Sequence, residues 1–308
     1  MTDQALRAED VRKTYRPRGG PAVDALSGVS MSVARGERVA LLGRNGAGKT
    51  TFLKIASTLL TPTSGTIEVF GHDVGRTPDD VRPLIAVVPQ EGKPFFHLTP
   101  REQIYTYLRA RGFDRGTAHE RTSAVLGEMG LEEVADRLSI NLSGGQRQRT
   151  MVATVIATAA PLLFLDEPTI GMDPFGRRGV WESLRALTRR GSTILLTTHY
   201  LDEAEALSNR LYVVERGRVL VAGTADSLKQ QVGGTLRVSI AGGVAMAPTF
   251  ASFGAPVTDG TTLHVIIDPS RLTEILGLAV RGGLSATVGP VTLEEAFLRV
   301  VGRSIDED

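Results

Sequence analysis

Residues 43–51 read GRNGAGKTT, a glycine-rich segment that ends in a lysine and two threonines. It matches the pattern G-x-x-x-x-G-K-[ST], follows the apolar run Arg38–Leu42 and precedes a helical period over Lys49–Leu60. The N–H groups of such a loop can hold a phosphate, Lys49 can reach the β- and γ-phosphates, and the Thr50 hydroxyl can ligate Mg²⁺. An ordinary glycine-rich turn would not need this strand, loop and helix context. The predicted nucleotide-contacting residues of the pattern are Gly43, Arg44, Asn45, Gly46, Ala47, Gly48, Lys49 and Thr50.

Two adjacent carboxylates, Asp166 and Glu167, follow the apolar run Leu162–Leu165. Ligands bind at the carboxyl ends of strands in open α/β sheets, and neighbouring side chains on a strand diverge. Asp166 could therefore hold Mg²⁺ directly or through water, while Glu167 points at the γ-phosphate and orients or deprotonates the attacking water. Alone, an Asp-Glu pair after an apolar run is more often a solvated strand end. Beside a phosphate loop, catalysis is the favoured interpretation.

A second candidate anion site lies at Leu142–Gln146, which reads LSGGQ and precedes a helical run over Arg147–Ala159. Ser143 suits the N-cap position, behind which the first N–H groups of the helix are open. A plain capped helix would explain the serine but not the two successive glycines. One nucleotide does not need two such sites in one chain, so this site is expected to serve a nucleotide held by another copy.

The elements around these motifs alternate between strands and helices. Pro174–Arg190 and Leu201–Ser208 have helical periods, and Thr193–Thr198 is a strand-like run between them, which indicates a parallel sheet covered on both faces. Residues 1–36 predict small antiparallel strands, and residues from about 93 to 158 a helical insertion. From Thr235 the pattern changes to short strands separated by glycines and ends in the helix Leu293–Val301, so we place a domain boundary at Gly233-Gly234, between residues 1–232 and 235–308.

Composition narrows the possible functions. The 308 residues suit about two domains, and 42% hydrophobic residues suffice for a large core. A net charge of +1 gives no basic field for nucleic acid, and the absence of cysteine rules out disulfides and thiolate metal sites. The first ten residues lack the apolar core of a signal peptide, and the uncharged stretch Thr150–Leu165 is too short for a membrane span. We therefore expect a chain without a transmembrane helix and without a nucleic-acid partner.

The motifs together resemble those of the nucleotide-binding subunits of ATP-binding cassette (ABC) transporters, over residues 5 to about 232. The resemblance implies an α/β fold: a P-loop NTPase ABC cassette with a parallel-sheet core, an antiparallel β subdomain and a helical insertion, followed by a small α+β C-terminal domain. In the family's order, the chain has Walker A at residues 43–51, which adds Thr51 to the loop, the Q-loop glutamine Gln90, the signature Leu142–Gln146, Walker B at Leu162–Glu167, the D-loop Gly171–Asp173 and the switch histidine His199.

The resemblance also implies individual roles. Tyr15 falls where the family has an aromatic ring that stacks on adenine, although a lone tyrosine is more often surface packing. Gln90 would contact Mg²⁺ or the lytic water, and His199 would donate to the γ-phosphate, whereas without the family they are a polar loop residue and a strand-end cap. Asp173 would cross the dimer interface, or serve as N-cap of the helix that Pro174 begins, and both roles can hold together. The residues implied to close a second copy's nucleotide site are Ser143, Gly144, Gly145 and Gln146.

The implied function is a Mg²⁺-dependent ATPase that energises a separate multi-span permease at the cytoplasmic face of the membrane and works as a dimer, most simply a homodimer. Residues 197–205 (TTHYLDEAE), Trp181 and residues 291–298 (VTLEEAFL) look like daunorubicin-resistance-type drug exporters. Exporters of polysaccharides, lipids or sodium share much of this pattern and stay as alternatives. A soluble cassette protein that acts on ribosomes or DNA is opposed by the single cassette without a coiled-coil insertion, and a regulator without turnover by intact Glu167 and His199.

Overall fold

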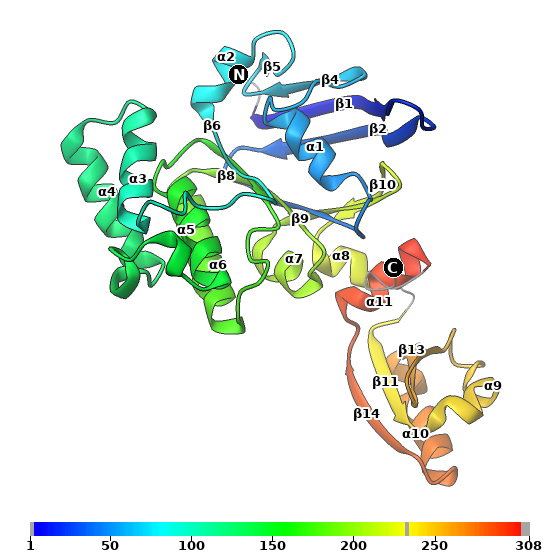
Figure 1. Ribbon diagram of the computed structural model, residues 1–308. Coiled ribbons are helices and arrows are strands. Elements are labelled where there is room, and N and C mark those ends of the chain that lie inside the picture. The colour runs from blue at the N-terminus through cyan, green and yellow to red at the C-terminus, as the bar shows by residue number, and fades with distance from the viewer. Residues whose placement is uncertain (1–2, 232–233, 303–308) are drawn as a thin grey trace. The chain divides into compact units, whose positions relative to one another are not determined.

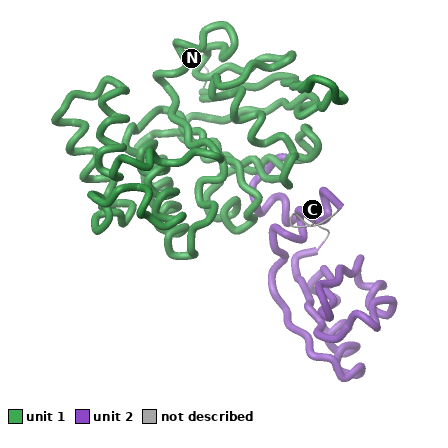
Figure 2. The backbone as a smooth tube through the Cα atoms, viewed as in Figure 1, with its two compact units in different colours: residues 1–221 green, residues 222–308 purple. Residues whose placement is uncertain are grey.

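The computed structural model describes residues 3–231 and 234–302. The chain forms two compact units, Met1–Val221 and Ala222–Asp308 (Figure 2). Each contains a sheet and a buried apolar cluster of its own. The boundary expected at Gly233-Gly234 includes Gly233, which lies outside the described residues, so the expected limits of 1–232 and 235–308 stay a prediction.

A six-stranded sheet in the order β10-β9-β3-β8-β7-β6 forms the centre of the first unit (Figure 1). Its pairings β9 with β3, β3 with β8, β8 with β7 and β7 with β6 are parallel. Because both faces of such a sheet are covered, its central strands are almost continuously apolar. The strands are β3 (Arg38–Leu42), β6 (Ile85–Val88), β7 (Leu162–Asp166), β8 (Thr193–Thr198), β9 (Arg210–Glu215) and β10 (Arg218–Gly223).

An antiparallel sheet in the order β2-β1-β4-β5 packs its apolar face into the same core as helix α1 (Lys49–Ala56). The helix buries Phe52, Leu53 and Ile55, but it ends four residues before Leu60, where the periodicity predicted its end. Thr58 has φ 63°, a left-handed conformation that a helix cannot continue. The strands are β1 (Gln4–Tyr15), β2 (Val23–Ala34), β4 (Ser64–Val69) and β5 (His72–Asp73).

Four helices of the first unit, α3 to α6, begin after a residue whose side chain caps the helix. Thr99 and Ser143 form capping boxes with the third residue of α3 and α5, and Asp173 caps α6. Helices α3, α4 and α5 lie within residues 93–158, where a helical insertion is expected, and pack on one another. The helices after α1 are α2 (Pro78–Val81), α3 (Pro100–Ala110), α4 (Arg115–Glu128), α5 (Gly144–Ile156), α6 (Pro174–Arg189) and α7 (Leu201–Leu207).

The second unit is a small α+β fold. Its antiparallel sheet has the order β12-β13-β11-β14. Strand β13 alternates between partly exposed and buried residues, so Leu263, Val265 and Ile267 face a core that also contains Phe250 and Ile275. The elements are α8 (Ala225–Gln230), β11 (Leu236–Ala241), α9 (Ala247–Phe250), β12 (Val257–Asp259), β13 (Thr262–Ile267), α10 (Leu272–Arg281), β14 (Ser285–Pro290) and α11 (Leu293–Val301).

No helix in residues 3–231 and 234–302 is both long and apolar enough to cross a membrane.

Candidate functional site

The glycine-rich loop connects buried β3 to the first turn of α1. Gly48 is the N-cap of α1 with φ 103° and no capping side chain, so the first N–H groups of the helix are open to an anion. A Cβ at Gly48 would lie 2.5 Å from the Ala25 carbonyl oxygen, whereas one at Gly46 would meet no atom within 4 Å. The loop therefore packs tightly against the protein at one glycine and presents open backbone at the other.

Lys49 lies over this loop. Its side chain is buried, and Nζ donates to the carbonyl oxygens of Gly43, at 2.6 Å, and Arg44, at 2.9 Å. The ammonium group is thereby held at the loop whose amides would receive the phosphates. A cation at this place complements the charge of a triphosphate.

Three oxygen-bearing side chains from three elements meet at Thr50, the second residue of α1. The Thr50 Oγ1 atom lies 3.1 Å from Asp166 Oδ1, at the end of β7, and 3.2 Å from Gln90 Oε1, two residues after β6. Hydroxyl, amide and carboxylate oxygens are the ligands that Mg²⁺ prefers when phosphates complete its coordination. Burial raises the pKa of Asp166, and hydrogen bonds from Thr197 and Thr50 partly oppose this rise. The donor set fits a magnesium ion.

Glu167 leaves the strand in a different direction from Asp166 because its backbone turns. Its φ of 51° is left-handed, at a cost of about 1–2 kcal/mol for a residue with a Cβ. Its Oε1 atom lies 3.1 Å from Nδ1 of His199, which follows β8. Burial alone raises the pKa of Glu167, but His199, Lys49 and Gln90 together outweigh it and hold the pKa below its ordinary value. The structure thus favours an ionised carboxylate that faces the imidazole.

A cavity of about 400 Å³ joins these groups. It contains most of the residues expected to bind the nucleotide, and Tyr15 lies at its edge, 40% exposed, with Lys13 Nζ 5.5 Å from the ring centre. Gly43 and Arg44 contact Lys49 from behind the loop, and Asp166 contacts Thr50. The lining residues are Tyr15, Val23, Ala25, Asn45, Gly46, Ala47, Gly48, Lys49, Thr50, Thr51, Gln90 and Glu167.

The signature residues do not line that cavity. Ser143 Oγ accepts the N–H of Gln146 at 3.2 Å, and Gln146 Oε1 accepts the N–H of Ser143 at 2.9 Å, which closes a capping box at the start of α5. Asp173, also expected at the nucleotide, caps α6 by accepting the N–H of Gly176 at 2.6 Å. Within one chain, the structure therefore keeps Ser143, Gly144, Gly145, Gln146 and Asp173 apart from the phosphate loop.

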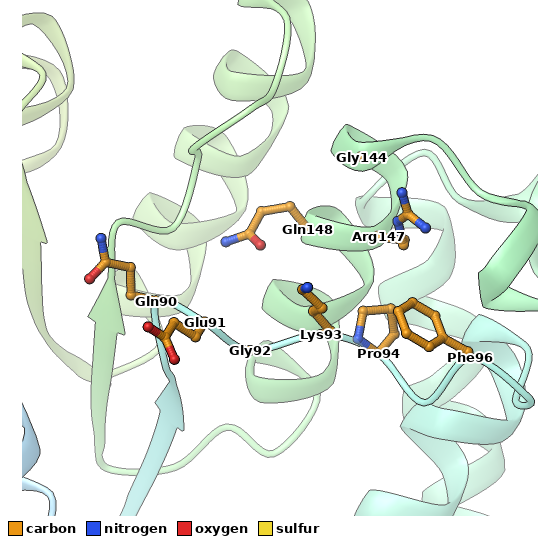
Figure 3. Close-up of a pocket in the computed structure, with 9 residues that line it drawn as sticks. All are labelled: Gln90, Glu91, Gly92, Lys93, Pro94, Phe96, Gly144, Arg147 and Gln148. Carbon is orange, nitrogen blue, oxygen red and sulfur yellow. The ribbon is translucent and has the colours of Figure 1, made fainter.

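A second cavity of about 320 Å³ lies between the segment after β6 and the start of α5 (Figure 3). Gln90 is at one end, and Gly144, Arg147 and Gln148 of α5 are on the other side. Gln148 Nε2 donates to the Pro168 carbonyl oxygen at 3.2 Å, so α5 is tied to the backbone just after Glu167. The start of α5 thus does not share the cavity at the phosphate loop. Within one chain, α5 is connected to the segment after Glu167 by the hydrogen bond from Gln148 to Pro168.

Three buried polar residues near the site were missed by sequence reasoning. Thr197 contacts Asp166 and Glu167, Gln103 accepts the N–H of Phe95 at 2.9 Å, and Glu203 accepts the Thr169 hydroxyl at 2.7 Å. Thr197 and Glu203 lie within residues 197–205, which carry the family resemblance without giving either residue a role, and Gln103 belongs to no motif. A single polar residue in an apolar strand or helix carries no signal until its neighbours are known. The alternation of apolar and polar residues could only have marked them as buried.

Comparisons with known proteins agree with this geometry. A family model described as "ABC transporter" matches residues 26–170. The chain is 37% identical to the daunorubicin/doxorubicin resistance ATP-binding protein DrrA of Streptomyces peucetius, over 99% of this chain and 94% of that protein. It is also 37% identical to the Nod factor export ATP-binding protein I of Burkholderia orbicola, over 92% and 93% of the two chains.

Solved structures give the same result. A structure described as the ATP-binding subunit of an ABC transporter superposes with a TM-score of 0.66 and 31% identity, over 74% of this chain and 93% of that one. The cassette MJ0796, in a dimeric post-hydrolysis state bound to ADP and Pi, superposes with a TM-score of 0.66 and 27% identity, over 71% and 98%. With a near full-length relative at 37% identity, the chain belongs to the family of ATP-binding subunits of ABC transporters.

Proposed function

We propose that this ATP-binding subunit hydrolyses ATP with the residues gathered around the phosphate loop, and that it energises a separate membrane permease for drug efflux. The observation that carries the proposal is one cavity lined by the open α1 N-terminus, Lys49, Thr50, Gln90 and Glu167. Asp166 and His199 do not line it, but they contact Thr50 and Glu167. These are the parts that phosphoryl transfer to water requires: a phosphate clamp, a cation site and a base.

The first step of the mechanism is to hold the triphosphate. The amides of residues 45–50 and the Lys49 ammonium would bind its β- and γ-phosphates and stabilise the charge that spreads over the transferring group. Thr50, Asp166 and Gln90 would hold Mg²⁺, which neutralises phosphate charge when it is bound. Tyr15, at the edge of the cavity, would stack on the adenine.

The second step is to activate the water. Glu167, kept ionised by its neighbours, would accept the proton of the attacking water, and the 3.1 Å contact with His199 fixes the carboxylate. Because Nδ1 of His199 donates to this carboxylate, the ring can also donate to the γ-phosphate through Nε2 only when both nitrogens carry hydrogen. Gln90 would contact the cation or the water from the segment after β6.

The signature residues would complete the site of a second copy. Ser143 and Gly145 start α5 outside the cavity of their own chain, and a side chain added at Gly144 would meet nothing within 4 Å. This open helix start suits the nucleotide of a partner subunit, with Asp173 beside the same interface. ATP would then hold two copies together until hydrolysis lets them separate.

The coupling to a permease is supported by exposed apolar residues beside the Gln90 segment. Phe95 is 72% exposed, and Phe96, Leu138 and Ile140 are also exposed. A single apolar residue on a surface is ordinary, whereas a group of four indicates an interaction surface. The N–H of Ile140 donates to the Phe96 carbonyl oxygen at 3.2 Å, so the two segments form one surface. A cytoplasmic helix of the permease would dock here, and this subunit would then lie at the cytoplasmic face of the membrane.

Drug efflux is supported by the names of the relatives from Streptomyces, which are daunorubicin and doxorubicin resistance proteins. Export of another class of molecule is the second candidate, since the chain is as similar to a Nod factor export protein. The permease selects the transported molecule, so identifying that subunit decides between the two.

The test begins with a tagged chain purified in mild detergent from its native membranes, with copurifying proteins identified and ATPase activity compared with the Glu167→Gln variant. Loss of a general base costs about a hundredfold to ten-thousandfold in rate, and the trapped ATP should hold Glu167→Gln as a dimer in size-exclusion chromatography. A multi-span membrane protein together with Glu167-dependent ATPase supports the proposal. Ribosomal or DNA-repair partners without a permease, or a monomeric Glu167→Gln at saturating ATP, would contradict it.

A further inference from the structure

We propose that Thr197 is a positioning residue of the ATPase site, whose hydroxyl fixes the relative orientation of Asp166 and Glu167. The inference rests on the roles proposed above for these two carboxylates. Thr197 is fully buried in β8, next to β7 in the sheet, and the parallel register places it opposite Asp166. Because paired residues of neighbouring strands present their side chains to the same face, the Thr197 hydroxyl lies against the Asp166 carboxylate.

One hydroxyl group serves both acidic residues. Thr197 Oγ1 donates to Asp166 Oδ1 and accepts the backbone N–H of Glu167 at 3.1 Å. That N–H also faces the Thr197 carbonyl oxygen at 3.1 Å. The left-handed turn at Glu167, which aims its side chain at His199, is therefore anchored on Thr197 from its N–H side. A change at this hydroxyl acts on the direction of both carboxylates.

Thr50 and Thr197 share the same acceptor and hold it from two elements. Both hydroxyls contact Asp166 Oδ1, that of Thr50 at 3.1 Å. A Thr50 oxygen that ligates a cation, as its place in the loop predicts, uses a lone pair and keeps its hydrogen for Asp166. Thr197 differs from Thr50 because it also accepts the Glu167 N–H, and it thereby couples the direction of Asp166 to that of Glu167.

Strand packing alone does not require a hydroxyl at this position. Valine has the same branched shape, suits a buried strand and carries no polar group to satisfy. Thr197→Val therefore removes the hydroxyl with little change in volume, and Thr197→Ser keeps the hydroxyl and removes the methyl group. Thr193→Val is the matched control, because Thr193 is equally buried in β8 but bonds the Gly36 N–H at 3.0 Å, at the opposite end of the strand.

The experiment measures kcat and KM for ATP in the full chain, together with equilibrium binding of a non-hydrolysable β,γ-imido analogue in Mg²⁺ and in EDTA. Loss of a hydrogen bond to a charged group corresponds to about a tenfold to hundredfold effect. We expect a decrease of this size in the kcat of Thr197→Val, and an equal decrease in the factor by which Mg²⁺ strengthens its binding of the analogue. Affinity in EDTA should change less than about threefold, KM measured in Mg²⁺ should rise with the lost Mg²⁺-dependent affinity, and Thr197→Ser should recover most of the lost rate. Thr193→Val should behave as the wild type.

Three results would overturn the inference: Thr197→Val with wild-type kcat and Mg²⁺ response, Thr197→Ser as impaired as Thr197→Val, or an equal loss in Thr193→Val. Asp166→Asn, measured in parallel, separates this inference from the proposed function. If Asp166→Asn loses the Mg²⁺ response and Thr197→Val keeps it, the role of Thr197 alone is wrong. If Asp166→Asn also keeps it, the proposed cation site fails, and the inference fails with it.

Discussion

Gly145→Ala separates the two explanations of the signature segment, a capped helix and a surface that closes on another chain's nucleotide. Gly145 is the second residue of α5. A Cβ at this position would lie 3.5 Å from the Gly171 carbonyl oxygen and 3.7 Å from Met172 Cα, which are ordinary contacts. The single chain therefore has room for a methyl group here.

The substitution is expected to stabilise the single chain and to weaken the dimer. Alanine is favoured over glycine within a helix by about 0.5–1 kcal/mol, so the free energy of unfolding of the chain should stay constant or rise by up to this amount. An added methyl group in a closely packed interface costs about 1–3 kcal/mol, which corresponds to about a fivefold to 150-fold weaker ATP-dependent dimer. ATP binding to the single chain should not change, since Gly145 lies outside the cavity.

The assay combines urea unfolding, nucleotide binding, ATPase rate and dimer formation in the Glu167→Gln background. Gly179→Ala is the control, because Gly179 is inside α6 and an added Cβ there would meet no atom within 4 Å, so it too has room for a methyl group. The control should gain stability and keep full activity. A Gly145→Ala chain that dimerises and hydrolyses ATP normally would refute the interface role, and one that unfolds would refute the steric estimate.

Two further predictions concern binding and pH. Tyr15→Ala should weaken ATP binding by about 1–3 kcal/mol through lost stacking, while Tyr15→Phe keeps it, measured by calorimetric titration; equal affinities for all three chains would mean that the ring is only surface packing. Burial raises the pKa of Glu203, so its protonated form is favoured in the folded state, and its contribution to stability falls as pH rises from the ordinary glutamate pKa through the raised one. Glu203→Gln, which can still accept from Thr169 and Trp181, should gain stability over the wild type as pH rises, in urea unfolding at pH 5 and pH 8; an unchanged difference would contradict a raised pKa.

The phosphate loop could be predicted from the sequence because its chemistry is local. The loop glycines, Lys49 and Thr50 lie within nine adjacent residues, and the flanking strand and helix have periods of their own. Seven of these nine are among the twelve residues that line the cavity. Asp166 and Glu167 were predictable for a related reason: parallel strands end at the same edge of a sheet, and β7 and β3 both flank β8.

The contacts of Thr197 and Gln103 could not be predicted, because they depend on register between distant segments. Thr197 meets Asp166 only because β7 and β8 pair in one particular register, and a shift by one residue would turn its side chain to the other face. Gln103 connects Phe95 to Thr154, which is 51 residues further along the chain. The early end of α1 at Ala56 was not predictable either, since Leu59 and Leu60 continue the apolar period while Thr58 adopts a left-handed backbone.

The arrangement of the motifs gives a physical reason why the proposed mechanism needs a second copy, although the phosphate loop of one chain is intact. Lys49, Thr50 and Glu167 approach the triphosphate from one side, and the cavity that they line is open to solvent beyond Gly46, where an added side chain would meet nothing. Charge stabilisation is strongest where water is excluded, so one open half-site is a weak catalyst. The helix start at Ser143 has the complementary property: it is the proposed anion site and does not line the nucleotide cavity of its own chain, and α5 is tied to Pro168, next to Glu167, by Gln148. In the proposed dimer, joining the two halves across chains would exclude water and, through α5, would transmit that closure to the residue proposed to activate the water.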